Sequence, residues 1–200
     1  RLIVSKGHSS LSLYPILADR GYFPLTYLEG FVAEGSILAG HPDTRIPGIE
    51  TVTGSLGHGL GIGAGMALGL RRWAGNSGIY VLLGDGETQE GAVWESAMFA
   101  AHHGLSKLTA IVDNNGVSAT DHTANTINME PVGQKWAAAG WDVREVDGHS
   151  MSDLLEAFAG EGTSDRPKAI IADTGVIRCE IPRQGETLIK SVKRGDTTIL

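Results

Sequence analysis

Two short polar turns stand out because each follows an aliphatic run that predicts a buried strand. In the first, Asp85 lies between Gly84 and Gly86 directly after the run at residues 79–83, and a helix is expected from residue 89. A carboxylate between two glycines, after a strand and before a helix N-terminus, can present a metal ligand and free backbone N–H groups to a phosphate. The turn therefore outlines a diphosphate and magnesium site, although an ordinary strand-to-helix turn has the same pattern.

The second turn contains Asn115 and Val117 and follows the predicted strand at residues 108–112. One strand–helix unit returns the chain to the neighbouring position at the same edge of a parallel sheet, so the Asn115 amide oxygen and the Val117 carbonyl are expected beside Asp85. With two diphosphate oxygens and a water, these hard oxygens would complete an octahedron suited to Mg²⁺, with Ca²⁺ or Mn²⁺ as substitutes. Turn chemistry alone is the alternative explanation of an Asn-Asn-Gly sequence.

The elements that must position these turns alternate along the chain. Strands are predicted at residues 79–83, 108–112, 143–146 and 169–172, and they alternate with helices at 89–103, 132–139 and 152–159. Further helices are predicted before the first of these strands, at residues 9–19, 26–34 and 60–73. Short aliphatic strands bounded by helices predict an α/β fold, with a mostly parallel sheet covered by helices on both faces. The helix at 60–73 is rich in glycine, which costs helix stability and so indicates very close packing against a neighbour.

Composition limits the classes of function. The 200 residues are 42% hydrophobic and 20% charged, which suits one domain, placed at residues 1–173 and followed by an unassigned tail at 174–200. A net charge of −7 without a basic run argues against a nucleic-acid partner, and the stretch at 59–70 is too short to span a membrane. The single cysteine, Cys179, indicates a reducing, cytoplasmic location. Since the chain opens at Arg1 without a methionine, upstream residues are expected to be missing.

Four motifs in one order resemble the amino-terminal region of the transketolase family. They are Ser5-Lys6-Gly7-His8, Gly40-His41-Pro42-Asp43, Thr53-Gly54-Ser55-Leu56-Gly57-His58-Gly59 and Leu83-Gly84-Asp85-Gly86-Glu87-Thr88-Gln89-Glu90-Gly91, followed by Asn114-Asn115. The similarity covers residues 1–173 and is closest in pattern to the separately encoded amino-terminal subunit of two-chain transketolases. It implies the thiamine diphosphate-binding fold, as a diphosphate-binding domain, with thiamine diphosphate and a divalent metal ion as cofactors.

The resemblance also implies roles for particular residues. The cofactor would be bound by His8, Gly54, Leu56, Gly84, Asp85, Gly86, Glu87, Glu90 and Asn115, and the metal by Asp85, Asn115 and the Val117 carbonyl. His8 and His41 would be catalytic and handle the hydroxyl groups and protons of the donor, which suits a neutral imidazole. Taken alone, each histidine could be a loop or capping residue. Glu90 matches an acid that meets the partner's cofactor-activating glutamate, and an acid favoured in a first helical turn is the alternative.

The activity implied by the resemblance is that of a transferase of carbohydrate metabolism. It moves a two-carbon ketol unit from a ketose donor to an aldehyde acceptor, with sugar phosphates as substrates. The family's activating glutamate lies in a pyrimidine-binding domain, so the resemblance implies a carboxyl-terminal partner subunit, activity only with that partner, and a heterotetramer. The glycine-rich helix at 59–70 is expected to contact the partner.

Two departures from the family pattern keep other functions open. His58 stands where glutamine is common, and no histidine occurs from Thr174 to Leu200 where the family has a further active-site histidine. One alternative is a decarboxylating or acyl-transfer subunit that acts on a 2-oxo acid. The other is a non-catalytic subunit that binds the cofactor or the partner only.

Overall fold

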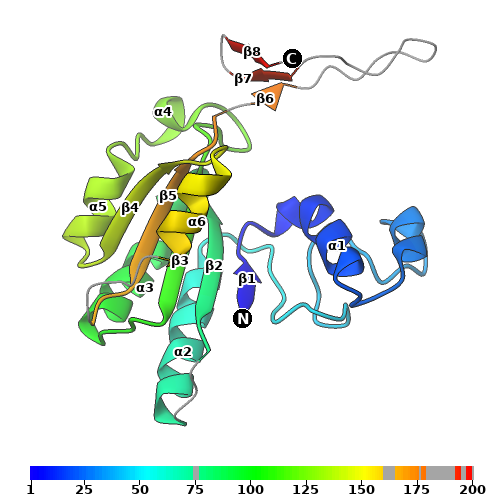
Figure 1. Ribbon diagram of the computed structural model, residues 1–200, viewed down its shortest axis with the longest axis horizontal. Coiled ribbons are helices and arrows are strands. Elements are labelled where there is room, and N and C mark those ends of the chain that lie inside the picture. Colours follow the sequence, from blue (N-terminus) through cyan, green and yellow to red (C-terminus); the bar gives the residue numbers. More distant parts are fainter. Residues whose placement is uncertain (74–76, 160–164, 176, 179–191, 195–196, 200) are drawn as a thin grey trace.

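A five-stranded parallel sheet forms the centre of the protein. The computed structural model describes residues 1–73, 77–159, 165–175, 177–178, 192–194 and 197–199. Its strands are β1 (Leu2–Val4), β2 (Ile79–Gly84), β3 (Leu108–Asn114), β4 (Asp142–Asp147) and β5 (Lys168–Asp173), in the order β1-β2-β3-β5-β4 (Figure 1). Because all four pairings are parallel, the carboxyl ends of the strands share one edge of the sheet. The predicted parallel α/β fold is confirmed.

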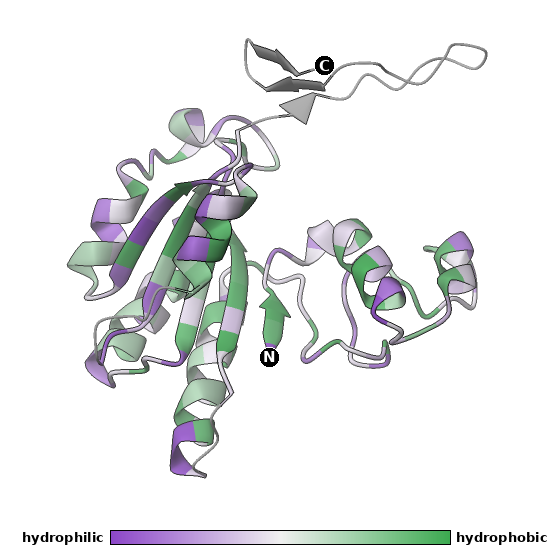
Figure 2. Cartoon of the chain, viewed as in Figure 1, coloured by the Kyte–Doolittle hydropathy of each residue, from purple (hydrophilic) through white to green (hydrophobic). Residues whose placement is uncertain are grey.

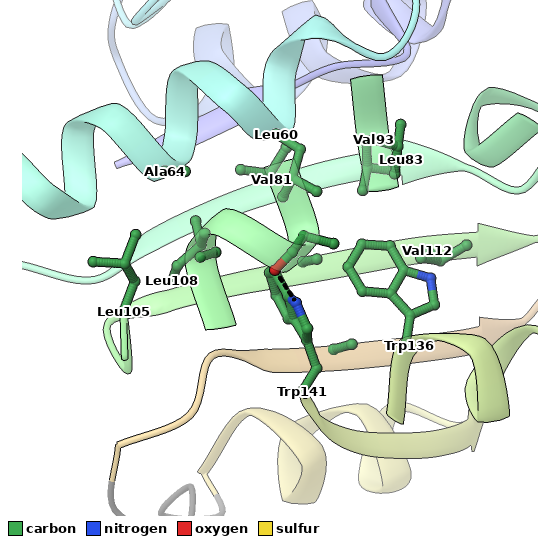
Figure 3. Packing of buried hydrophobic residues seen from close by; sticks show 14 of the residues in the cluster. Leu60, Ala64, Val81, Leu83, Val93, Leu105, Leu108, Val112, Trp136 and Trp141 are labelled. Atoms are coloured by element: carbon green, nitrogen blue, oxygen red, sulfur yellow. Dashed lines mark hydrogen bonds between the residues drawn. The ribbon is translucent and has the colours of Figure 1, made fainter. Parts of the chain in front are cut away.

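Helices cover both faces of this sheet. The helices α2 (His58–Arg72), α3 (Gly91–His102) and α5 (Val132–Ala138) contribute to one hydrophobic cluster with the inward side chains of β2, such as Val81 (Figure 3). Successive strand residues point to opposite faces. On the other face Tyr80 meets Phe158 of α6 (Met151–Ala159), with 6.1 Å between ring centroids.

The central strands of the sheet are more deeply buried than its edge. Every residue of β5 except the last is buried, whereas the edge strand β4 is only partly covered and is visibly more hydrophilic (Figure 2). Trp136 and Trp141 are buried, with ring centroids 4.8 Å apart, and the Trp141 indole N–H donates to the Ala97 carbonyl at 2.9 Å (Figure 3). That bond ties the start of β4 to α3. None of the helices in the described part of the chain has the length and apolarity to span a bilayer.

The glycines of α2 differ in what they contact, and this yields a stability prediction. A Cβ on Gly63 would lie 2.6 Å from Val81 Cγ2, whereas one on Gly65 would have no neighbour within 4 Å. We expect Gly63→Ala to lower the free energy of unfolding by about 1–3 kcal/mol through overpacking. Gly65→Ala should raise it by roughly 0.5–1 kcal/mol through helix propensity. Urea denaturation of both variants measures the two effects, and equal shifts would contradict the close packing of α2.

The amino-terminal segment forms a lobe beside the sheet (Figure 1). Its helix α1 (Ser10–Asp19) packs with later loop residues in a second cluster around Tyr14, Leu38 and Ile46. The Tyr14 hydroxyl donates to the Ala39 carbonyl at 2.8 Å, so α1 holds the start of the loop that carries His41.

Several elements differ from the sequence-based predictions. The predicted helix at 26–34 is wrong: a 3₁₀ helix spans Leu25–Gly30, and Phe31 then turns to ψ 125°, so the helix ends at the glycine. The sequence analysis did not predict β1, whose three residues are too few to show a period. A short helix α4 (Thr123–Thr126) follows the Asn115 turn. In the tail, β6 (Ile177–Arg178), β7 (Val192–Arg194) and β8 (Thr197–Ile199) form an antiparallel sheet. Cys179 lies outside the described residues.

Candidate active site

The turns after β2 and β3 meet at the carboxyl edge of the sheet. The two oxygens of Asp85 accept hydrogen bonds from backbone amides: Oδ1 from Gly86 and Oδ2 from Gly116, each at 2.8 Å. The Asp85 amide in turn donates to the Asp113 carbonyl at 3.2 Å. Asp85 is therefore 2% exposed and held by both turns, and the parallel register explains why they converge.

The other two oxygens of the expected metal set lie on the second turn. Asn115 Oδ1 accepts from the Val117 amide at 2.9 Å, and the Val117 carbonyl oxygen lies 3.8 Å from the position that a Cβ on Gly86 would take. A side chain at Gly86 would also come within 3.0 Å of Ser118 Cβ, so only glycine leaves this space open. Among the described residues no group of three His, Cys, Asp or Glu side chains could hold a metal. The expected set instead combines one carboxylate with amide and carbonyl oxygens.

The electrostatics of Asp85 fit a cation. Burial raises the pKa of Asp85, although the hydrogen bonds from Gly86 and Gly116 act in the opposite direction. The neighbouring Asp113 carboxylate also contributes to the raised pKa. A divalent cation beside the carboxylate would favour its ionised form, and carboxylate, amide and carbonyl oxygens are the ligands that Mg²⁺ and Ca²⁺ take. The residues present therefore fit the expected metal.

Lys6 of the amino-terminal motif forms an ion pair with Asp113. The sequence analysis did not predict this contact. The Lys6 ammonium lies 2.5 Å from Asp113 Oδ2, and the Thr174 hydroxyl donates to Oδ1 at 2.5 Å. Burial raises the pKa of Asp113, but the hydrogen bonds from Lys6 and Thr174 outweigh it and hold the pKa below its usual value. Since Lys6 pairs with Asp113, Asp85 is the carboxylate left for the metal.

Glu87 points into the protein. Its side chain is buried, Oε1 accepts from the Ser5 hydroxyl and from the Gly57 amide at 2.8 Å, and Oε2 accepts from the Gly84 amide at 3.2 Å. The sequence analysis expected Glu87 at the cofactor, and the structure shows it bonded to two other motifs, through Ser5 and Gly57, and to Gly84 of its own motif.

The two expected catalytic histidines are exposed and lie on adjacent segments, His8 in a 3₁₀ helix at Gly7–Ser9 and His41 in a loop. Gly54 has φ +148°, and a Cβ there would lie 3.2 Å from Cδ2 of His41, so the ring packs against the glycine. Gly7 packs as closely against Thr53, which places the His8 segment beside the same turn. Burial and the nearby Lys6 charge lower the pKa of His8, so at neutral pH its neutral imidazole, which can both donate and accept, is favoured.

Glu90 and Leu56 lie beside the same turn. Both are exposed, and a Cβ on Gly57 would lie 2.7 Å from Glu90 Cβ, so the glutamate lies against the turn that contains Leu56. Glu90 also immediately precedes α3. The structure is therefore compatible with both explanations of this acid.

Comparison with known proteins identifies the family. The family model described as "Transketolase, thiamine diphosphate binding domain" matches residues 1–188. The chain belongs to the transketolase family. Two similar relatives are an apulose-4-phosphate transketolase subunit of Phocaeicola vulgatus and the 6-deoxy-6-sulfo-D-fructose transketolase subunit SqwG of a Clostridium species. Each is 38% identical over 87% of this chain, which covers 62% and 64% of their respective lengths. The chain thus spans less than two thirds of these relatives.

Solved transketolases show the same fold. The transketolase of Leishmania mexicana superimposes with a TM-score of 0.83 at 32% identity over 87% of this chain and 28% of its own length. The transketolase of Campylobacter jejuni gives the same TM-score and identity, over 29% of its own length. The sheet of this chain is therefore the thiamine diphosphate-binding domain of the transketolase family.

Proposed function

We propose that this chain is the amino-terminal subunit of a thiamine diphosphate-dependent transketolase. The reaction would transfer a two-carbon ketol unit from a ketose donor to an aldehyde acceptor, with sugar phosphates as substrates. The observation that carries the proposal is the hydrogen bond between Asp85 Oδ2 and the Gly116 amide, because it joins the two turns that match the family's metal and diphosphate motif. The two-chain form is supported by similar relatives whose names describe them as transketolase subunits.

The residues of the two turns would hold the cofactors. Asp85, Asn115 Oδ1 and the Val117 carbonyl would bind Mg²⁺, or Ca²⁺ or Mn²⁺, because all three supply hard oxygens. The diphosphate would lie beside Gly84 and Gly86, where the absence of a side chain at Gly86 leaves room for it. Gly54 and Leu56 would contact the aminopyrimidine end, and Glu90 would lie near the partner subunit.

When bound, thiamine diphosphate supplies carbanion stabilisation, and the protein supplies binding and orientation. In this chain His8 and His41 would bind the donor hydroxyls and move protons, since their segments meet at the Thr53–Gly54 turn. Lys6 would keep Asp113 ionised and paired, so that the metal is drawn to Asp85. The carboxyl-terminal partner would provide the pyrimidine-binding domain in a cytoplasmic heterotetramer, with α2 among the contact surfaces.

Calorimetric titration of the paired subunits with thiamine diphosphate tests this proposal. We expect saturable binding with Mg²⁺ and at least about tenfold weaker binding without it, because a metal ion held by Asp85 would offset the repulsion between this carboxylate and the negatively charged diphosphate. Thiamine, which lacks the diphosphate, is the matched control ligand and should bind weakly in both conditions. Equal affinity with and without metal would contradict the assignment of Asp85, Asn115 and Val117.

A further inference from the structure

The amino terminus of α2 is capped by residues from distant parts of the chain. Its N-cap residue is Gly57, in the left-handed conformation at φ 83°, and it supplies no side-chain cap. Instead the Gly57 amide donates to Glu87 Oε1 at 2.8 Å, and the Gly59 amide donates to Ser5 Oγ at 3.2 Å. The Ser5 hydroxyl donates to the same Glu87 oxygen. A helix start needs such acceptors because its first amides have no partner within the helix.

We propose that Glu87, with Ser5, is a positioning residue that fixes the distance between the two ends of the cofactor site. We call this pair the Ser5–Glu87 clamp. It joins the Gly54–Leu56 turn to Gly84, whose amide donates to Glu87 Oε2 at 3.2 Å. The proposal rests on the proposed function in one respect, namely that the turn and the Asp85 region bind opposite ends of one ligand.

The clamp is set in the protein interior. Glu87 and Ser5 are 3% and 1% exposed. A buried carboxyl group has to have its oxygens satisfied, and a lost partner here is not replaced by water. The clamp is therefore a fixed connection.

The two regions that the clamp joins differ in their other support. Gly84 and Asp85 are fixed by the pairing of β2 with β3. On the other side, the turn at Gly54 is preceded by a longer backbone bond, from the Thr53 amide to the Pro42 carbonyl at 3.4 Å. Loss of the clamp should therefore displace the Gly54–Leu56 turn more than the turn that contains Gly84 and Asp85.

Glu87→Gln is the sharpest perturbation of the clamp. Glutamine has the same shape, but only one of its two terminal atoms can accept a hydrogen bond. If its oxygen keeps Ser5 and Gly57, its NH₂ group faces the Gly84 amide, and donor meets donor. Ser5→Ala is the second variant, because it removes one hydroxyl and leaves Glu87 intact. Glu156→Gln on α6 is the matched control, since Glu156 is exposed on the opposite face of the sheet.

Amide hydrogen exchange of the ligand-free chain tests the clamp without reference to function. In Glu87→Gln we expect the Gly84 amide, or the Gly57 amide if the glutamine turns its oxygen toward Gly84, to exchange at least about tenfold faster, because that amide loses a buried acceptor. The β3 amides should exchange as in the wild type, and Ser5→Ala should accelerate chiefly Gly59. Unchanged exchange at both Gly84 and Gly57 in Glu87→Gln, or equal acceleration throughout the sheet, would overturn the proposal.

Binding by the assembled subunits tests the consequence for the site. In Glu87→Gln we expect affinity for thiamine diphosphate with Mg²⁺ to fall about tenfold, and affinity for magnesium pyrophosphate to change less than about threefold, since pyrophosphate does not reach the Gly54–Leu56 turn. Equal losses for both ligands would indicate a merely structural role, and no loss of thiamine diphosphate affinity would also overturn the proposal. A wild-type complex that binds neither ligand would refute the proposed function, and the exchange experiment would still decide the clamp.

Discussion

Replacing Asp85 with asparagine in the assembled enzyme is expected to lower the rate of ketol transfer by at least about 10³-fold, because a catalytic metal stabilises charge by several kcal/mol. Asp85 is the one carboxylate in the expected metal set, and the neighbouring Asp113 is occupied by Lys6. Asparagine keeps the shape and one acceptor oxygen, so the loss reports the charge. Steady-state kinetics measure the rate of ketol transfer, and calorimetry measures the affinity for thiamine diphosphate with Mg²⁺. The rate and the affinity should fall together.

The same variant should not unfold the chain. Because burial raises the pKa of Asp85, the ionised carboxylate lowers the free energy of unfolding as the pH rises from the ordinary value of 3.8 through the folded value. Removing the charge at neutral pH removes this cost, but the asparagine NH₂ group leaves either the Gly86 or the Gly116 amide without its acceptor, so the two effects oppose each other and thermal unfolding of the ligand-free variant should change little. The exposed Asp19→Asn is the matched control. Retained ketol transfer in the Asp85 variant would instead favour a non-catalytic, cofactor-binding subunit.

The candidate site could be located from sequence because its geometry follows from the sheet. Aliphatic runs at residues 79–83 and 108–112 mark two parallel strands, and neighbouring parallel strands end at one edge. The meeting of Asp85 with the Gly116 turn is therefore a consequence of register. The close packing of α2 was predicted from its glycine content; Gly63, which faces the sheet, confirms it, whereas Gly65 has open space.

The supporting contacts could not be predicted in this way. Lys6 and Asp113 are 107 residues apart, and Ser5 and Glu87 are 82 apart. Such pairs depend on how β1 aligns with β2, and β1 is too short to show a period. Only the position of Lys6 and Ser5 in the His8 motif, and of Glu87 beside Asp85, indicated that they lie near the site.

The chain without its partner subunit is expected to show no ketol transfer above background, at least about 10⁴-fold below the assembled enzyme, because chemistry at a reactive carbanion requires exclusion of water. The expected site is open to solvent in the described part of the chain. His8, His41, Gly54 and Glu90 are exposed, and Leu56 is 36% exposed, all around one turn. A site that binds and protects its cofactor would bury these groups, and under the proposed function the carboxyl-terminal partner covers them.

Mixing the chain with its carboxyl-terminal partner should therefore restore activity with a dependence on partner concentration that saturates at equal amounts of the two subunits. The partner mixed with the Asp85→Asn chain is the control, because that chain should still assemble while the expected metal site lacks its carboxylate. Full turnover by the purified chain alone would show that the exposed groups are covered within the chain or between its copies, and the two-subunit proposal would fail. Restoration by the partner with the wild-type chain, and not with the variant, would place the metal-dependent half of the reaction on this subunit.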